Sequence, residues 1–153
     1  AGARLHADGT NPVSGNIADD PAKPLQVIRL AAVALGDLHA AHVCFTDDIC
    51  IYDCIEFNDR FRYCDVASEI AFLAMDLDRY QQASLSRHLV DIYVRLSRDE
   101  ELLTMRSFYM CYRAYVRGKV ESFKLDDPLI SQSEKVKALE SARSYFGLAE
   151  SYV

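Results

Sequence analysis

The feature that most constrains the fold is a series of amphipathic segments that begins after Asp65. In the first segment, apolar side chains recur with the spacing of one helical face. They are Val66, Ile70, Leu73, Ala74 and Leu77. Three further segments show comparable spacing, and Asp65 stands where an N-cap is expected. The predicted helices cover residues 66–78, 82–97, 100–123 and 131–151.

The segment before these helices has the composition of a β-hairpin. Residues 43–46 and 49–52 are rich in β-branched and aromatic side chains, and the Asp47-Asp48 pair between them suits a two-residue turn. Strands and helices do not alternate, so a parallel sheet is not expected. The predicted class is α+β, mainly α, with a hairpin over residues 43–52 followed by a helical subdomain over residues 65–152.

Composition excludes several classes of protein. The net charge of −6 argues against a nucleic-acid surface, which needs a clustered basic face. No apolar stretch approaches the roughly 20 residues that span a bilayer, so we expect no membrane contact and a cytoplasmic location. The five cysteines lack paired C-x₂-C spacing, which favours free buried thiols over a zinc site. Residues 1–24 have no apolar period, which predicts a flexible leader before a domain of residues 25–153.

Two aspartates, Asp37 and Asp53, lie on either side of the predicted hairpin. A loop carboxylate can orient a hydroxyl nucleophile and accept its proton, and a carboxylate at a hairpin end can hold the Mg²⁺ that bridges nucleotide phosphates. Asp37 alone is better explained as part of a polar turn before a strand. Their pairing predicts a phosphotransferase, with a catalytic loop over residues 35–42 and a metal loop over residues 53–60.

Two histidines follow Asp37 in the same predicted loop. His39 could orient Asp37 or stabilise charge, or it could be an ordinary loop residue. His42 could bind the second metal through a ring nitrogen, or form a hydrogen bond beside it, because imidazole is softer than Mg²⁺ prefers. The candidate site therefore has Asp37 and His39 as catalytic residues, with His42 and Asp53 binding the metal and the nucleotide.

Other polar residues have open assignments. Glu56 and Asn58 either bind metal-bound water or belong to a solvated loop edge. Asp65 fits an N-cap better than a ligand, and Glu69 could reach a basic partner. A basic cluster on the third helix could pair with the acidic loops, bind an anionic substrate or form a solvated face. Its members are Arg113, Arg117 and Lys119.

At these residues the chain resembles the aminoglycoside phosphotransferase family, which has a protein-kinase-like fold and a H-G-D-x-H-x-x-N loop before a hairpin-end Asp. The matching residues are Gly36, Asp37, His39 and Asp53. Residues 52–58, 65–77 and 112–119 are similar to a bacterial branch in which such a domain is fused to a C-terminal P-loop ATP-binding domain. The resemblance covers about residues 34–152 and implies the C-terminal lobe of the kinase-like fold.

The resemblance also implies a reaction, the Mg²⁺-dependent transfer of the γ-phosphoryl of ATP or GTP to a hydroxyl of a small-molecule substrate. Asp37 would be the catalytic base, Asp53 the Mg²⁺ ligand and Asp65 a structural anchor. Leu35 and His42 depart from the family's His and Asn. The sequence shows neither a nucleotide-binding N-lobe nor a G-x-x-x-x-G-K-[ST] motif. An N-lobe and a P-loop domain are therefore expected partners. The chain alone is expected to be poorly active.

Two other functions stay open. The departures at Leu35 and His42 favour a catalytically dead kinase-like module used for binding or regulation. A metal-dependent hydrolase would need Asp37, His39, His42 and Asp53 to converge within about 2.0–2.2 Å of one ion. The sequence does not identify the phosphate acceptor. The helices carry Tyr and Arg and not the dense acidic patch that would suit polycationic aminoglycosides.

Overall fold

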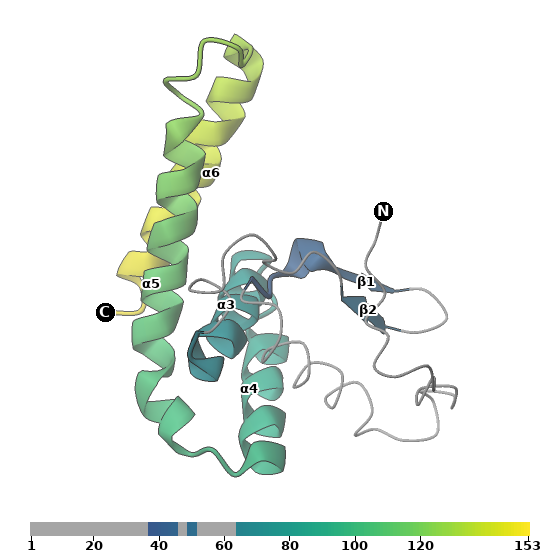
Figure 1. Cartoon of the computed structure of the whole chain (residues 1–153). Coiled ribbons are helices and arrows are strands. Elements are labelled where there is room, and N and C mark those ends of the chain that lie inside the picture. Colours follow the sequence, from purple (N-terminus) through teal and green to yellow (C-terminus); the bar gives the residue numbers. More distant parts are fainter. Residues whose placement is uncertain (1–36, 46–48, 52–63) are drawn as a thin grey trace.

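The computed structural model describes residues 37–45, 49–51 and 64–153. Its elements are, in order, the 3-10 turn η2 (Ala40–His42), strands β1 (Val43–Phe45) and β2 (Ile49–Ile51), and helices α3 (Val66–Arg79), α4 (Ala83–Ser97), α5 (Glu101–Phe123) and α6 (Gln132–Glu150) (Figure 1). Each long helix begins and ends within one residue of the range expected from spacing, so the helical predictions are confirmed.

The predicted α+β class is wrong, because the described residues are mainly helical. β1 and β2 have three residues each and pair antiparallel, with Val43 opposite Ile51 and Phe45 opposite Ile49. This short ladder lies to one side of the helices, and its described side chains, Val43 and Ile51, pack against the helical core (Figure 1). The chain is therefore mainly α, and the hairpin predicted over residues 43–52 is reduced to this ladder.

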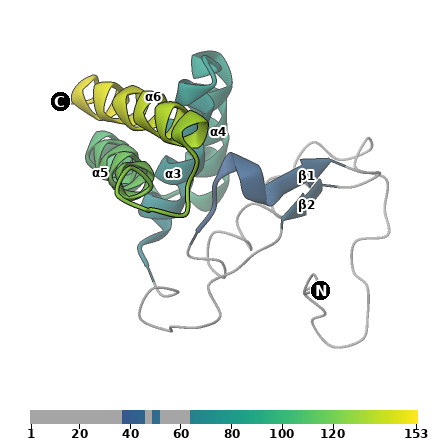
Figure 2. The same ribbon diagram turned by 90° about the horizontal axis from the view of Figure 1, so that it is seen from above.

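Helix α3 is central because it packs against α4 and α5 and also contacts α6 and η2 (Figure 2). Its N-terminus is capped by Asp65, whose carboxylate accepts a hydrogen bond from the Ala67 N–H at 2.9 Å. This confirms the predicted N-cap. Every residue from Ala67 to Asp76 is buried, including the acidic Glu69 and Asp76. A helix buried on all sides must supply partners for its charged groups, and the candidate site shows which ones α3 uses.

Helices α5 and α6 form a long antiparallel pair that projects beyond α3 and α4 (Figure 1). The turn into α6 is fixed by a capping box, in which Ser131 and Glu134 satisfy each other's backbone N–H groups. The helices approach closely at Gly118, where an added Cβ would lie 2.8 Å from the Phe146 ring. Tyr145 points from α6 toward α3 and is buried, so α6 contributes to the core beside the site.

Several predictions fall on residues outside the described part of the chain. They concern the leader over residues 1–24, the Asp47-Asp48 turn, and the metal loop over residues 53–60 with Asp53. Of the described helices, none is both long and apolar enough to cross a membrane. Cys64 and Cys111 are free thiols, as expected, but Cys64 is exposed and Cys111 only partly buried.

Candidate functional site

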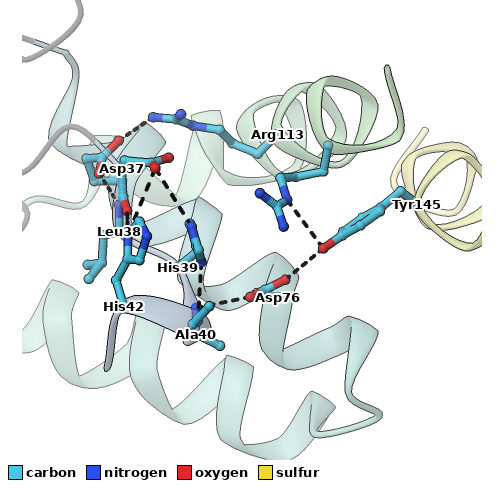
Figure 3. A network of polar contacts seen from close by, with 11 residues as sticks. Asp37, Leu38, His39, Ala40, His42, Asp76, Arg113 and Tyr145 are labelled. Atoms are coloured by element: carbon cyan, nitrogen blue, oxygen red, sulfur yellow. Dashed lines mark hydrogen bonds and ion pairs between the residues drawn. The ribbon is translucent and has the colours of Figure 1, made fainter. Parts of the chain in front are cut away.

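The candidate site is built on residues 37–42, which cross one face of α3 (Figure 3). Leu38 is fully buried and His39 nearly so, whereas 38% of the Asp37 side chain is exposed. The buried Leu38 anchors the loop in the core, and Asp37 immediately before it keeps its carboxylate accessible to solvent. This arrangement gives a fixed carboxylate at the protein surface.

Two buried carboxylates of α3 hold the loop backbone. The Leu38 N–H donates to Glu69 Oε2 at 2.8 Å, and the Ala40 N–H donates to Asp76 Oδ2 at 3.0 Å. Glu69 and Asp76 are seven residues apart, about two helical turns, so they lie on the same face of α3. The N–H groups of Leu38 and Ala40 are thereby fixed to one rigid helix, which holds the backbone that follows Asp37.

The charge of Glu69 is balanced by α5. Arg113 forms an ion pair with Glu69 and donates through Nε to Ser68 Oγ at 3.0 Å. The Cys64 thiol also donates to Glu69 Oε1, at 3.2 Å. Burial, and then the charge of Glu69, raise the pKa of Cys64 to about 12, so this residue stays a neutral thiol donor. The expected basic partner of Glu69 is therefore Arg113.

Asp76 connects the loop to α5 and α6 through Tyr145. The Tyr145 hydroxyl donates to Asp76 Oδ1 at 3.4 Å and accepts from Arg117 Nε at the same distance (Figure 3). Burial is the main cause of the raised pKa of Tyr145, which keeps its hydroxyl protonated. The Arg79 guanidinium lies over the Tyr145 ring, 4.3 Å from its centroid. All three helices α3, α5 and α6 thus contribute to the support of the loop.

The two predicted histidines lie beside Asp37, as Figure 3 shows. Asp37 Oδ2 is 3.7 Å from His39 Nε2 and 3.9 Å from His42 Nδ1, and the two imidazole centroids are 3.8 Å apart. His39 Nδ1 accepts the Ala41 N–H at 3.2 Å, so in the neutral ring the proton is on Nε2, facing Asp37. Burial, and then the neighbouring His42, lower the pKa of His39, which favours this neutral form.

His42 has the opposite tautomer. Its Nδ1 lies 2.9 Å from the Asp37 carbonyl oxygen, which can only accept, so Nδ1–H donates there and Nε2 carries the lone pair. Asp37 is therefore held by His42 through its backbone and faces an N–H of His39 through its side chain. The structure thus places His39 beside the Asp37 carboxylate, its orienting role stays a prediction, and His42 has a hydrogen bond that closes the loop.

One ligand atom each from Asp37, His39 and His42 could face a common ion, since the three atoms lie within 4.8 Å of one another. Two imidazoles and one carboxylate are a poor set for Mg²⁺, which prefers oxygen. His39 is also a poor ligand for any metal, because a metal on Nε2 would leave Nδ1–H pointing at the Ala41 N–H. The described residues therefore fit a carboxylate flanked by two imidazoles better than the metal site of a hydrolase. Asp53, the predicted Mg²⁺ ligand, lies outside them.

Sequence reasoning missed Asp76 and Tyr145 as parts of this site. A signal for Asp76 was present, because it shares with Glu69 the apolar face of the predicted helix, where an unpaired carboxylate would be costly. Tyr145 gave no such signal, since it is 69 positions from Asp76 and one of nine tyrosines.

Comparison with known proteins gives relatives without a stated activity. No protein-family model matches the chain, and no solved structure matches it significantly. The chain is similar to uncharacterized proteins of Mycobacterium bovis and Mycobacterium tuberculosis, each 35% identical over 109 residues. The matched part is 71% of this chain and 21% of each relative. The chain thus spans about a fifth of the length of the curated relatives it matches.

Proposed function

We propose that this chain provides the catalytic base of a phosphotransferase that moves the γ-phosphoryl of ATP or GTP to a hydroxyl of a small molecule. The observation that carries the proposal is the half-exposed Asp37 carboxylate, on a loop whose Leu38 and Ala40 N–H groups are fixed by buried carboxylates of α3. Positioning and charge stabilisation supply most of the catalysis in this reaction class. A carboxylate held in this way suits that requirement.

The chemistry assigned to the described residues is a proton transfer. Asp37 accepts the proton of the acceptor hydroxyl as its oxygen attacks the γ-phosphorus and the nucleoside diphosphate leaves. His39, neutral and with its Nε2–H facing Asp37, orients the carboxylate for this step. Asp53 and His42 stay the proposed ligands of Mg²⁺, which would supply charge neutralisation on the phosphates. His42 would have to use Nε2, because its Nδ1–H is donated to Asp37.

Most of the groups that bind the nucleotide are proposed to lie outside the described residues. The mycobacterial relatives are about five times as long as the segment that they share with this chain, which leaves room for the N-lobe and the P-loop domain that the resemblance implies. The cytoplasm, which supplies ATP and GTP, is the proposed location.

Calorimetric titration with Mg²⁺ plus ATP or GTP tests the nucleotide part of the proposal. Asp53→Asn is the test variant, and Asp91→Asn, on the exposed face of α4, is the matched control. We expect binding by the wild type and by Asp91→Asn, and its loss in Asp53→Asn. Equal binding by all three would contradict the assignment of Asp53. If the wild type and a longer version with the N-terminal part both fail to bind, a dead binding module becomes the better interpretation.

The catalytic part is tested by turnover in that longer version. We expect Asp37→Asn to lower kcat by about 10²–10⁴-fold, the usual contribution of a general base, with nucleotide affinity unchanged. A parallel loss of affinity, or an unchanged kcat, would remove Asp37 from the role of base.

A further inference from the structure

Two arginines on the helices beside the Asp37 loop have no ion-pair partner among the described residues. Arg79 and Arg117 both face Tyr145, with guanidinium carbons 4.3 Å and 5.6 Å from its ring centroid. Arg113, one turn before Arg117 on α5, is already paired with Glu69. Within the described part of the chain, neither Arg79 nor Arg117 forms an ion pair. Two cations thus share one ring without a carboxylate of their own.

The acidic residues near these two arginines are occupied elsewhere. Asp76 uses one carboxylate oxygen for the Ala40 N–H and the other for the Tyr145 hydroxyl. Glu121, one turn after Arg117, pairs with Lys124 through both oxygens. Asp78 accepts from the Tyr152 hydroxyl at 2.8 Å. These hydrogen bonds do not remove the negative charges of the three carboxylates, but within the described residues none of the three forms an ion pair with Arg79 or Arg117.

The same cluster is short of hydrogen-bond acceptors. Arg79 donates through Nη2 to Ser141 Oγ at 3.1 Å, but its buried Nε has no partner. The single hydrogen bond of Arg117 to a described residue is the one from Nε to the Tyr145 hydroxyl. Its two Nη groups remain as donors, and a guanidinium edge of this kind matches a carboxylate or phosphate.

Arg117 is also linked to the Asp37 loop by hydrogen bonds. It connects through Tyr145 and Asp76 to Ala40, by successive contacts of 3.4, 3.4 and 3.0 Å. Ala40 is three residues from Asp37, a separation of at most about 11 Å along the chain.

We propose that Arg117, supported by Tyr145 and Arg79, binds an anionic group, a carboxylate or a phosphate, of the molecule whose hydroxyl faces Asp37. The inference rests on the proposed phosphotransferase function and assigns the substrate class: a hydroxylated small molecule with negative charge. A polycationic aminoglycoside would meet two guanidinium groups without an ion-paired carboxylate here and is disfavoured as acceptor.

The first test observes the arginine Nε–H signals by NMR while inorganic phosphate or acetate is added in the presence of EDTA. We expect a saturable change at Arg117, with Arg113 unchanged because Glu69 and Ser68 already occupy it. A response to phosphate alone indicates a phosphorylated acceptor, and one to acetate alone a carboxylated acceptor. No change at Arg117, or an equal change at the exposed Arg87, would overturn the proposal.

Variants make the test independent of spectral assignment. We expect Arg117→Gln to weaken anion binding at least tenfold, which is the loss of about one charge-assisted hydrogen bond. Arg117→Lys keeps a charge but loses the two-pronged geometry, so it should bind with intermediate affinity. Arg87→Gln, on the outer face of α4, is the matched control and should bind like the wild type. Equal binding by folded Arg117→Gln or Arg117→Lys and the wild type would refute the assignment.

The two proposals can fail separately. EDTA removes any metal that could bridge phosphate to Asp53, so anion binding at Arg117 is measured without the nucleotide site. If Arg117 binds the anion while nucleotide binding is insensitive to Asp53→Asn, the anion site stands and the assignment of Asp53 falls. If Asp53→Asn abolishes nucleotide binding while Arg117 is silent, the phosphotransferase stands and the acceptor class is wrong.

Discussion

Replacing Glu69 by Gln tests the structural basis of the site most directly. Glu69 is fully buried, and its carboxylate receives donors from Leu38, Arg113 and Cys64. Gln has the same size and keeps one acceptor oxygen, but it removes the charge opposite Arg113, whose side chain is only 13% exposed. Removing one partner of a buried ion pair costs about 3–5 kcal/mol, because the other charge stays buried without compensation. We expect the free energy of unfolding to fall by about 3–4 kcal/mol.

The assay is urea unfolding followed by circular dichroism at pH 7, with a double-mutant cycle. Arg113→Gln alone should also destabilise the protein, and the double variant should lose less than the sum of the single changes, by at least about 2 kcal/mol. Lys124→Gln is the matched control, since it removes an exposed ion pair with Glu121 and should cost at most about 1 kcal/mol. A loss below about 1 kcal/mol in Glu69→Gln, or coupling near zero, would refute the reasoning.

Hydrogen exchange then separates stability from the positioning of the loop. The Leu38 N–H bonds to Glu69, so Glu69→Ala should raise its exchange rate through local opening. Arg113→Gln keeps the acceptor and should affect this amide only through the lower global stability. If both variants change Leu38 exchange in proportion to their stability, the loop is not fixed by Glu69 in particular.

Three further predictions concern the surroundings of the site. Burial lowers the pKa of His39 from its usual value of 6.5, so as the pH falls the unfolded chain binds this proton before the folded protein does. The free energy of unfolding should therefore fall as the pH decreases below about 6.5. Measured by urea unfolding at pH 7.5 and 5.5, this free energy should decrease less in His39→Gln than in the wild type. Gly118→Ala should destabilise the protein by about 1–3 kcal/mol, because the added Cβ would clash with the Phe146 ring. In a Phe146→Ala background the same change should stabilise the protein by about 1 kcal/mol, because Ala is the better helix former. Equal effects in the two backgrounds would contradict the clash. Ser131→Ala removes the N-cap of α6 and should cost about 1 kcal/mol in thermal unfolding; an unchanged midpoint would show that the cap is dispensable.

The helices could be predicted from the sequence because their burial follows a local period. Val66, Ile70 and Leu73 recur on one face, and Asp65 stands where its carboxylate can cap the first turn. The fold class could not be predicted in the same way. The composition of residues 43–52 indicates strand, but strand propensity does not determine how far two strands pair. Here they pair over three residues each, too few to change a mainly helical class.

The proximity of Asp37, His39 and His42 could also be predicted, since they lie within six residues of one another. What the motif does not contain is the support from α3. Asp76 binds Ala40 from 36 positions away, and only the packed helix brings the two together. The geometry of Asp37 is therefore a property of the helical core as much as of the loop. Substitutions that loosen α3 should disturb the carboxylate before they unfold the protein, whatever acceptor it serves.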